Sequence, residues 1–375
     1  MNALTEILRA RIAEGGPLSF SEFMAAALYH PEHGYYRRAR DPFGREGDFF
    51  TAAQLQPVFG RLVAQEIARL RDGMGAPAEF EVWDLGAGRG EMREALAPFA
   101  YRAIDAGDEW PERLTGVVFA NELFDALPVD AARRCEAGFV EMRVAWEEGR
   151  FVWTAGPALA DAALEYALRH APEEEDARFE IPCAAFPLLN RLAAVLDRGY
   201  ILAIDYGYTR AERLRFPAGT LMSYRRHRAL DDVLAAPGAC DITAHVPFDA
   251  LSEYAARRGL RRVRFESLAA FLLRVGEADQ FAAALDAGRG AGVPPLRDTA
   301  QDSPGGHGRD LPLPPLGELR AFPKKQPAPV ARGRLVGFPL PRSLRNAALL
   351  LLLRGLLGGL LSRRLLGGLL GCELH

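Results

Sequence analysis

The sequence has almost no lysine and almost no excess charge of either sign. Its only two lysines, Lys324 and Lys325, are adjacent, and arginine supplies the other basic residues of this 375-residue chain. The chain has 46 lysines and arginines against 49 aspartates and glutamates, so its formal net charge is −3. Such a chain has no overall positive field that would hold a nucleic-acid backbone. We therefore expect no nucleic-acid partner.

Cysteine is scarce as well. The first sixteen residues, MNALTEILRARIAEGG, lack the apolar stretch of a signal peptide, and the acids Glu6 and Glu14 are untypical of a mitochondrial presequence. We therefore expect a cytoplasmic, bacterial protein with reduced thiols and no metal site. The four cysteines lie far apart, without a CxxC pair or a histidine at metal-ligand spacing: Cys135, Cys183, Cys240 and Cys372.

A long uninterrupted apolar run is also missing. The leucine-rich C-terminal end is broken by Arg354, Arg363 and Arg364, so it falls short of the roughly 18 apolar residues of a membrane-spanning helix. From about residue 291 the chain is rich in Pro, Gly, Arg and Leu without clear periodicity. We expect residues 291–375 to be a low-complexity tail, either disordered or the product of a shifted reading frame, and we expect no membrane span.

Between the two ends, apolar periodicity alternates between that of helices and that of strands. This alternation predicts an α/β fold with a mostly parallel sheet, and turn signals between Arg133 and Trp153 indicate inserted antiparallel strands. We expect an N-terminal helical segment at 1–75 packed on an α/β domain at 76–290, with the insertion near 130–200. The predicted helices are 2–14, 19–29, 54–72, 90–97, 157–170 and 184–197, and the predicted strands are 81–85, 101–104, 117–121, 200–205 and 240–246.

The stretch EVWDLGAGRG (81–90) predicts a buried strand followed by a glycine loop and a helix. Its glycines, Gly86, Gly88 and Gly90, follow G-x-G-x-G rather than the G-x-G-x-x-G of a dinucleotide site. Asp84, two residues before the first glycine, suits S-adenosyl-L-methionine, whose amino group it would meet at the strand end. A tight turn without any ligand would also use such glycines.

Several stretches occur together in one order: GREGDFFTAAQLQPVFGRLVAQEI (44–67), VWDLGAGRGEM (82–92), VVFANELFDALPV (117–129), ILAIDYGY (201–208), GTLMSYRRHR (219–228) and DITAHVPF (241–248). With LSFSEFMAAALYHPEHGYY (18–36), they resemble the S-adenosylmethionine-dependent methyltransferases that include the mitochondrial assembly factor of respiratory NADH dehydrogenase and its bacterial relatives. The resemblance covers residues 10–280.

The resemblance implies a class I, Rossmann-like methyltransferase fold, S-adenosyl-L-methionine as cofactor, and methylation of an arginine in a partner protein such as a respiratory dehydrogenase subunit. A cationic, planar acceptor such as a guanidinium requires carboxylates placed so that they can accept its paired N–H groups. NELFD places Asn121, Glu122 and Asp125 just beyond a strand, at the sheet edge where ligands bind. Glu122 is the first candidate for holding the acceptor and Asp125 the second. Asn121 capping the turn and Asp125 paired with an arginine would be purely structural alternatives.

Other site residues follow from the resemblance or from spacing. Gly47 and Asp48 are implied to shape a loop over the cofactor, and Asp205 ends a strand at the rim of the site. Only 30 residues separate Gly90 from Asn121, so one strand–helix unit of a class I sheet must be short or missing. Asp105 is therefore either the acid that binds ribose, expected roughly 20 residues after the loop, or an acid near the adenine.

These motifs leave three functions open. The leading one is a methyltransferase acting on a protein, with arginine as the acceptor. The second is a non-catalytic binding or assembly protein, which the short region 91–120 would fit. The third is an oxidoreductase that uses the glycine loop for a dinucleotide. The family's HVDF motif reads HVPF here, with Pro247 in place of an acid.

Overall fold

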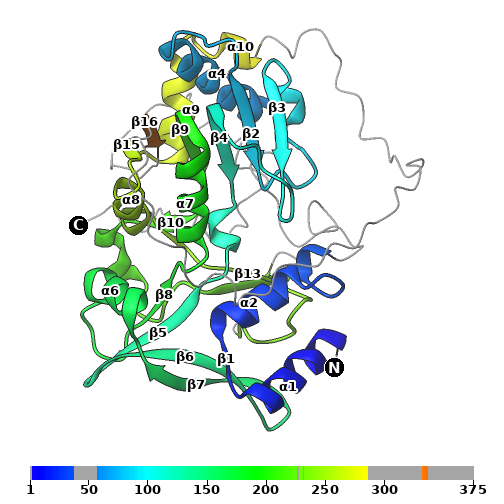
Figure 1. Cartoon of the computed structure of the whole chain (residues 1–375), viewed down its shortest axis with the longest axis vertical. Helices are drawn as coiled ribbons and strands as arrows, with labels where there is room; N and C mark the ends of the chain where they lie inside the picture. The colour runs from blue at the N-terminus through cyan, green and yellow to red at the C-terminus, as the bar shows by residue number, and fades with distance from the viewer. Residues whose placement is uncertain (1, 38–56, 226–227, 231, 286–331, 337–375) are drawn as a thin grey trace, which may run out of the picture.

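A six-stranded parallel sheet lies in the upper half of the molecule in the view of Figure 1. The computed structural model describes residues 2–37, 57–225, 228–230, 232–285 and the backbone of 332–336. All neighbouring strands of this sheet run parallel, which confirms the predicted α/β fold. The strand order is β15 (Arg261–Arg264), β16 (Arg332–Val336), β9 (Leu196–Ile204), β4 (Leu114–Asn121), β2 (Glu81–Leu85) and β3 (Ala100–Ile104).

Both faces of this sheet are buried, which explains the continuous apolar runs of its central strands. Val82 and Val117 lie on the face covered by α4 (Pro57–Gly73) and α9 (Leu268–Glu277). Trp83 and Val118 lie on the face covered by α7 (Ala185–Val195) and α8 (Phe248–Ala256). The short helices α5 (Arg93–Leu96) and α10 (Ala282–Leu285) pack beside α4.

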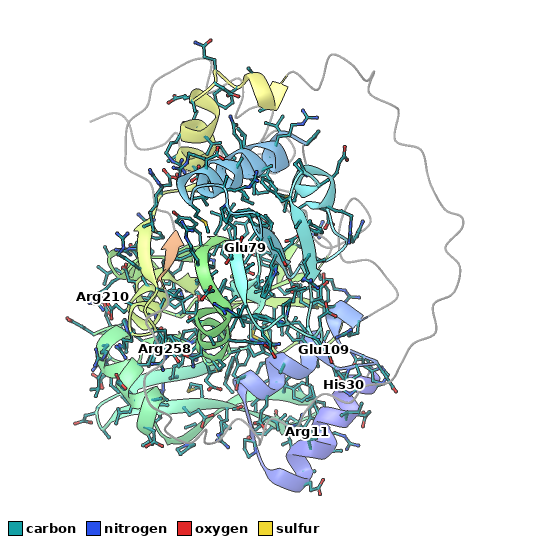
Figure 2. All side chains as sticks on the ribbon, turned by 45° about the horizontal axis from the view of Figure 1, so that its top comes forward. Arg11, His30, Glu79, Glu109, Arg210 and Arg258 are labelled. Atoms are coloured by element: carbon teal, nitrogen blue, oxygen red, sulfur yellow. The ribbon has the colours of Figure 1, made fainter. Side chains whose placement is uncertain are left out.

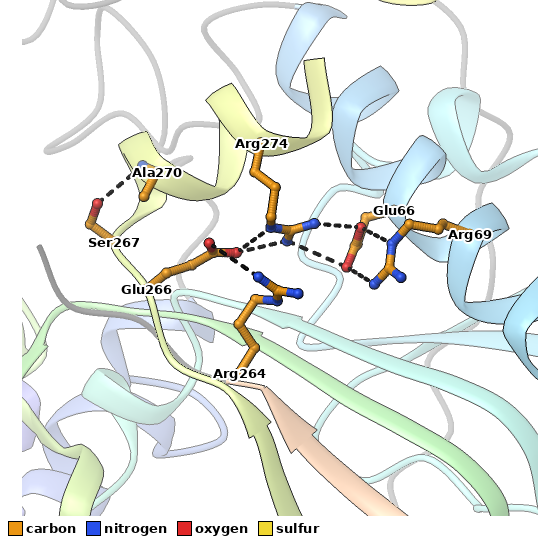
Figure 3. Close-up of polar contacts among 7 residues, drawn as sticks. All are labelled: Glu66, Arg69, Arg264, Glu266, Ser267, Ala270 and Arg274. Atoms are coloured by element: carbon orange, nitrogen blue, oxygen red, sulfur yellow. Dashed lines mark hydrogen bonds and ion pairs between the residues drawn. The ribbon is translucent and has the colours of Figure 1, made fainter. Parts of the chain in front are cut away.

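Charged side chains join α9 to α4 (Figure 3). Glu66 of α4 is only 3% exposed and accepts hydrogen bonds from Arg69 at 2.7 and 2.8 Å and from Arg274 of α9 at 3.1 and 3.4 Å. Arg274 also donates to Glu266 at 2.7 and 2.9 Å. The Ser267 hydroxyl caps α9 by accepting the Ala270 N–H. These bonds fix the helix layer on the first face of the sheet.

The expected antiparallel insertion forms a second sheet, below the parallel one in Figure 1. Helices α1 (Ala3–Gly15) and α2 (Phe20–Tyr29) cover one of its faces, and α6 (Asp161–His170) packs against the other. The N-terminal segment is therefore divided, because α1 and α2 pack on this sheet whereas α4 packs on the parallel sheet. The strands are β5 (Asp130–Cys135), β6 (Gly138–Glu147), β7 (Arg150–Ala158), β8 (Arg178–Ile181) and the two-residue β1 (Leu18–Ser19), which pairs with β6.

The short connection between β2 and β4 holds only α5 and β3. One strand–helix unit of a class I sheet is thus missing here, as the 30-residue spacing predicts. Among the described residues, β3 consequently forms the edge of the sheet and pairs only with β2.

The predicted strand at 240–246 is wrong as a single element. β13 (Asp241–Thr243) pairs with β11 (Met222–Arg225), whereas β14 (Val246–Pro247) pairs with β10 (Gly207–Tyr208). Between them the Ala244 N–H donates to the Asp125 carbonyl at 2.9 Å, so the chain leaves one sheet to contact a turn and then enters another. The remaining short elements are η1 (Tyr35–Arg37), η2 (Phe124–Ala126), η3 (Arg210–Arg215) and β12 (Arg228–Leu230).

Part of the expected tail contributes to the main sheet. Residues 332–336 form β16, between β9 and β15, so this short segment has regular structure. The rest of 291–375 lies outside the described residues, as do Gly47 and Asp48. Within the described ranges, no helix combines the length and the apolar character needed to cross a membrane.

Candidate active site

The carboxyl ends of β2, β3, β4 and β9 lie side by side. Leu85 at the end of β2 is in register with Ile104 of β3 and Ala120 of β4, and Asn121 of β4 is in register with Ile204 of β9. Figure 2 labels Glu109, which follows β3, and Glu79, which precedes β2 and therefore lies at the opposite end of the parallel strands. The residues that follow the four strands are Gly86, Asp105, Glu122 and Asp205.

The glycine loop needs glycine for its conformation and for close contacts. Gly86, Gly88 and Gly90 all have positive φ, at 72°, 57° and 75°. A Cβ on Gly86 would lie 2.8 Å from the Leu123 side chain, so the loop packs directly on the turn that follows β4. The Gly88 N–H donates a hydrogen bond to Asp105. These bonds and contacts place the glycine loop between the two polar turns.

Asp84 lies at the base of the glycine loop and is only 3% exposed. Its carboxylate accepts a hydrogen bond from the Tyr101 hydroxyl of β3 at 2.8 Å. The pKa of Asp84 is raised to about 6, mainly by burial and to a smaller extent by the charges of Asp105 and Glu91, against the opposing effect of the hydrogen bond from Tyr101. A positively charged ligand group would favour its ionised form.

Asp105 follows β3 directly, beside the glycine loop. Burial raises the pKa of its carboxyl, and the bond from the Gly88 N–H lowers it. Its own N–H donates to Asp108 at 2.7 Å, which fixes the turn. This position, at the end of the first strand after the loop, favours the ribose-binding alternative over the adenine one.

The turn after β4 presents Glu122 in an unusual conformation. Its φ is +50°, in the left-handed region that non-glycine residues rarely adopt. Its N–H donates to the Ile204 carbonyl at 2.8 Å. The buried Oδ1 of Asn121, one residue earlier, has no hydrogen-bond partner among the described residues. A buried acceptor of this kind requires a donor, and a bound ligand could supply it.

Asp125 is buried in a group of acids. Its pKa lies well above the usual range, mainly through burial and then through the carboxylates of Asp205, Asp241 and Glu122. Asp205, at the end of β9, accepts the N–H groups of Leu123 at 3.1 Å and Phe124 at 2.7 Å. Burial and the charge of Glu122 raise the pKa of Asp205 to about 7, against these bonds. Asn121, Glu122 and Asp125 are thus brought together with Asp205.

Sequence analysis missed three residues of this site. The Tyr36 hydroxyl donates to Asp241 at 3.0 Å, and the Tyr29 hydroxyl donates to the Ala126 carbonyl at 2.9 Å. Both tyrosines come from the N-terminal stretch and Asp241 from DITAHV, and these stretches indicate the family without assigning a role to single residues. The structure shows why they matter, because their side chains surround the turn that carries Asp125.

The candidate site therefore consists of two adjoining halves. One half, with Asp84, Asp105 and the glycine loop, fits a small molecule that has an amino group and a ribose. The other half, with Glu122, Asp125 and Asp205, offers carboxylates to a cation. The part of the chain that the structure describes includes no group of three or more histidines, cysteines and acids arranged to hold a metal ion.

Comparisons with known proteins agree with this geometry. A family model described as "Putative S-adenosyl-L-methionine-dependent methyltransferase" matches residues 93–266. The chain is 27% identical, over 68% of its length and 71% of the relative's, to the Drosophila melanogaster protein arginine methyltransferase NDUFAF7 homolog, a mitochondrial protein. It is 24% identical, over 68% and 70%, to the human mitochondrial protein arginine methyltransferase NDUFAF7.

Solved structures show the same relationship. A likely methyl transferase from Burkholderia thailandensis, crystallised with S-adenosyl-homocysteine, is 32% identical and superposes with a TM-score of 0.64 over 76% of this chain and 86% of its own. A second crystal structure from that organism, 32% identical, superposes with a TM-score of 0.62 over 75% and 82%. The dinucleotide alternative has no counterpart among these relatives. With a glycine loop and acids that suit the same cofactor, this chain belongs to the family of S-adenosyl-L-methionine-dependent methyltransferases.

Proposed function

We propose that the protein transfers a methyl group from S-adenosyl-L-methionine to the guanidinium of an arginine in a partner protein. The observation that carries the proposal is the contact between the two halves of the site. Gly86 of the cofactor loop packs on Leu123, and the neighbouring Glu122 lies in a group of carboxylates. The fly and human relatives named as protein arginine methyltransferases support the choice of acceptor.

The residues of the first half would hold the cofactor. Asp84 and the N–H groups of the glycine loop suit the amino and carboxylate groups of its methionine part, and Asp105 suits the ribose hydroxyls. Gly47 and Asp48 are expected to complete this half. When bound, S-adenosyl-L-methionine supplies an electrophilic methyl group on a sulfonium.

The residues of the second half would hold and deprotonate the acceptor. Among its acids, burial and neighbouring charges favour the neutral form of Asp125, because they raise its pKa well above the usual range. Glu122 is then the carboxylate that accepts guanidinium N–H groups, orients the attacking nitrogen and takes its proton. Asn121 would accept a further N–H through its Oδ1, which has no hydrogen-bond partner in the part of the chain that the structure describes.

We propose further that the partner is a subunit of a respiratory dehydrogenase and that the protein meets it in the bacterial cytoplasm. The resemblance to the mitochondrial assembly factor supports the choice of partner. The few, widely spaced cysteines support the location.

Glu122→Gln tests the proposed function because it keeps the shape of the side chain but removes its charge. We expect methyl transfer to fall by roughly 10²- to 10⁴-fold, while S-adenosyl-homocysteine affinity changes less than about twofold. Transfer would be measured with radiolabelled S-adenosyl-L-methionine on a lysate of cells that lack the protein, and affinity by calorimetry. Glu79→Gln, an exposed carboxylate at the other end of β2, is the matched control.

Two results would contradict the proposal. Full transfer by the Glu122→Gln variant would remove Glu122 from the mechanism. If the wild-type protein binds S-adenosyl-homocysteine but labels no protein of the lysate, the non-catalytic assembly function would replace the enzymatic one.

A further inference from the structure

The carboxylate of Asp205 binds the backbone of the turn that carries Glu122. This carboxylate lies just after β9, and it accepts hydrogen bonds from the backbone N–H groups of Leu123 at 3.1 Å, Phe124 at 2.7 Å and Tyr206 at 2.8 Å. Two of these donors belong to the neighbouring turn after β4. The side chain that directly follows β9 therefore fixes the turn that presents Glu122.

This turn needs support from outside its own sequence. Glu122 has a φ of +50°, which is unfavourable for a residue with a side chain. The bond from its N–H to the Ile204 carbonyl, at 2.8 Å, holds it on one side. The two bonds from Leu123 and Phe124 to Asp205 hold it on the other. The chain at the end of β9 thus supplies both restraints on the strained residue.

We infer that Asp205 is a positioning residue that holds Glu122 in the orientation used for acceptor binding and sets the charge around it. The inference rests on the proposed function, since it assigns Glu122 to the acceptor. Asp205 itself touches the protein backbone, so its action passes through the turn.

The charge of Asp205 acts on the same acids. After burial, it is the largest contribution to the raised pKa of Asp125, followed by Asp241 and Glu122. The hydroxyls of four tyrosines also face this group: Tyr29, Tyr36, Tyr206 and Tyr224. Removing the Asp205 charge should therefore lower the pKa of the neighbouring carboxyls, whereas loss of a merely structural bond would not.

Asp205→Asn tests both effects. We expect kcat for methyl transfer to fall about 10- to 100-fold with S-adenosyl-homocysteine affinity within about twofold of wild type, and the acidic limb of the kcat profile to move to lower pH. Asp205→Glu keeps the charge and both oxygens but displaces them, so kcat should fall with the acidic limb unmoved. The control is Asp249→Asn, since Asp249 also accepts a backbone N–H, from Arg210 at 2.9 Å, but lies on α8.

Amide hydrogen exchange of residues 121–127, followed by mass spectrometry, separates this inference from the proposed function. Faster exchange in Asp205→Asn than in wild type supports the positioning of the turn, whether or not the lysate contains a substrate. Unchanged exchange overturns the inference. If wild type is active, an Asn variant with wild-type kcat and an unmoved acidic limb overturns it as well. A wild type that labels no protein refutes the proposed function alone.

Discussion

At the scale of single residues, burial raises the pKa values of three acids of the site by different amounts. Asp84 has a pKa of about 6 and Asp205 of about 7, and that of Asp125 lies well above the usual range, each mainly because of burial. Such groups reduce the stability of the fold, because their charged forms are poorly solvated. Perturbed carboxyls that lie together at a sheet edge are typical of functional sites.

Asp84 gives a prediction about pH. Its pKa in the folded protein lies above the ordinary 3.8, so the folded state binds this proton more tightly than the unfolded state. The group therefore lowers stability as pH rises from about 4 to 6. A ligand ammonium favours the ionised form, so affinity for S-adenosyl-homocysteine should rise roughly tenfold between about pH 5 and 7, as measured by calorimetry.

Asp84→Asn is the control for this pH dependence. It should bind S-adenosyl-homocysteine more weakly at neutral pH and lose the part of the pH dependence that is centred near the Asp84 pKa of about 6. Asp105, whose pKa is also raised by burial, would leave a smaller residual dependence. An equal pH dependence in the Asn variant would show that Asp84 does not meet the ligand ammonium.

At the scale of elements, the ion-pair network in Figure 3 predicts how α9 is held. Arg274→Ala removes two bonds to the buried Glu66 and leaves this carboxylate with Arg69 alone. We expect the free energy of unfolding to fall by roughly 1–3 kcal/mol, as measured by urea denaturation. Arg264→Ala is the control, because Arg264 is 41% exposed and lies 3.9 Å from Glu266, so it should change stability by less than about 0.5 kcal/mol. Equal losses in both variants would contradict this account.

The elements also show what the sequence could predict. The bounds of the strand at 81–85 were predicted correctly, because its apolar run is followed directly by Gly86, and a glycine at this place indicates a turn. The strand at 240–246 could not be resolved, since its break depends on the Ala244 bond to Asp125, which lies far away in the chain. Helix α9 was not predicted, although its apolar face packs on the sheet.

The same distinction applies to the candidate site. Asp84 could be selected because it stands two residues before the first glycine of the loop, and Glu122 because residues just beyond parallel strands meet at one edge. Tyr36 and Asp241 could not, because they lie 205 residues apart in sequence and only the fold brings them together. The hydrogen bonds from the Leu123 and Phe124 N–H groups to Asp205 likewise depend on the register of β4 and β9.

At the scale of the whole molecule, the N-terminal helical layer completes a site that belongs to the parallel sheet. Tyr29 ends α2 and donates a hydrogen bond to the turn after β4, whereas Tyr36 lies in η1 and donates to Asp241 at the start of β13. The rings of the two tyrosines lie 5.6 Å apart. The layer formed by α1, α2 and the antiparallel sheet is therefore joined to the acceptor half of the site by specific polar contacts.

A double-mutant cycle between Tyr36 and Asp241 measures this connection across the molecule. Because the Tyr36 hydroxyl donates to Asp241 at 3.0 Å, Tyr36→Phe and Asp241→Asn should be non-additive in the free energy of unfolding, with a coupling of about 1–2 kcal/mol. The matched control is Tyr29→Phe, whose hydroxyl donates to a backbone carbonyl, so its effect should add to that of Asp241→Asn within about 0.5 kcal/mol. Urea denaturation of the single and double variants gives both couplings. Additive effects for the Tyr36 pair would mean that the bond between Tyr36 and Asp241 does not help to hold the N-terminal layer on the site, and methyl transfer by Tyr36→Phe would then remain at the wild-type rate.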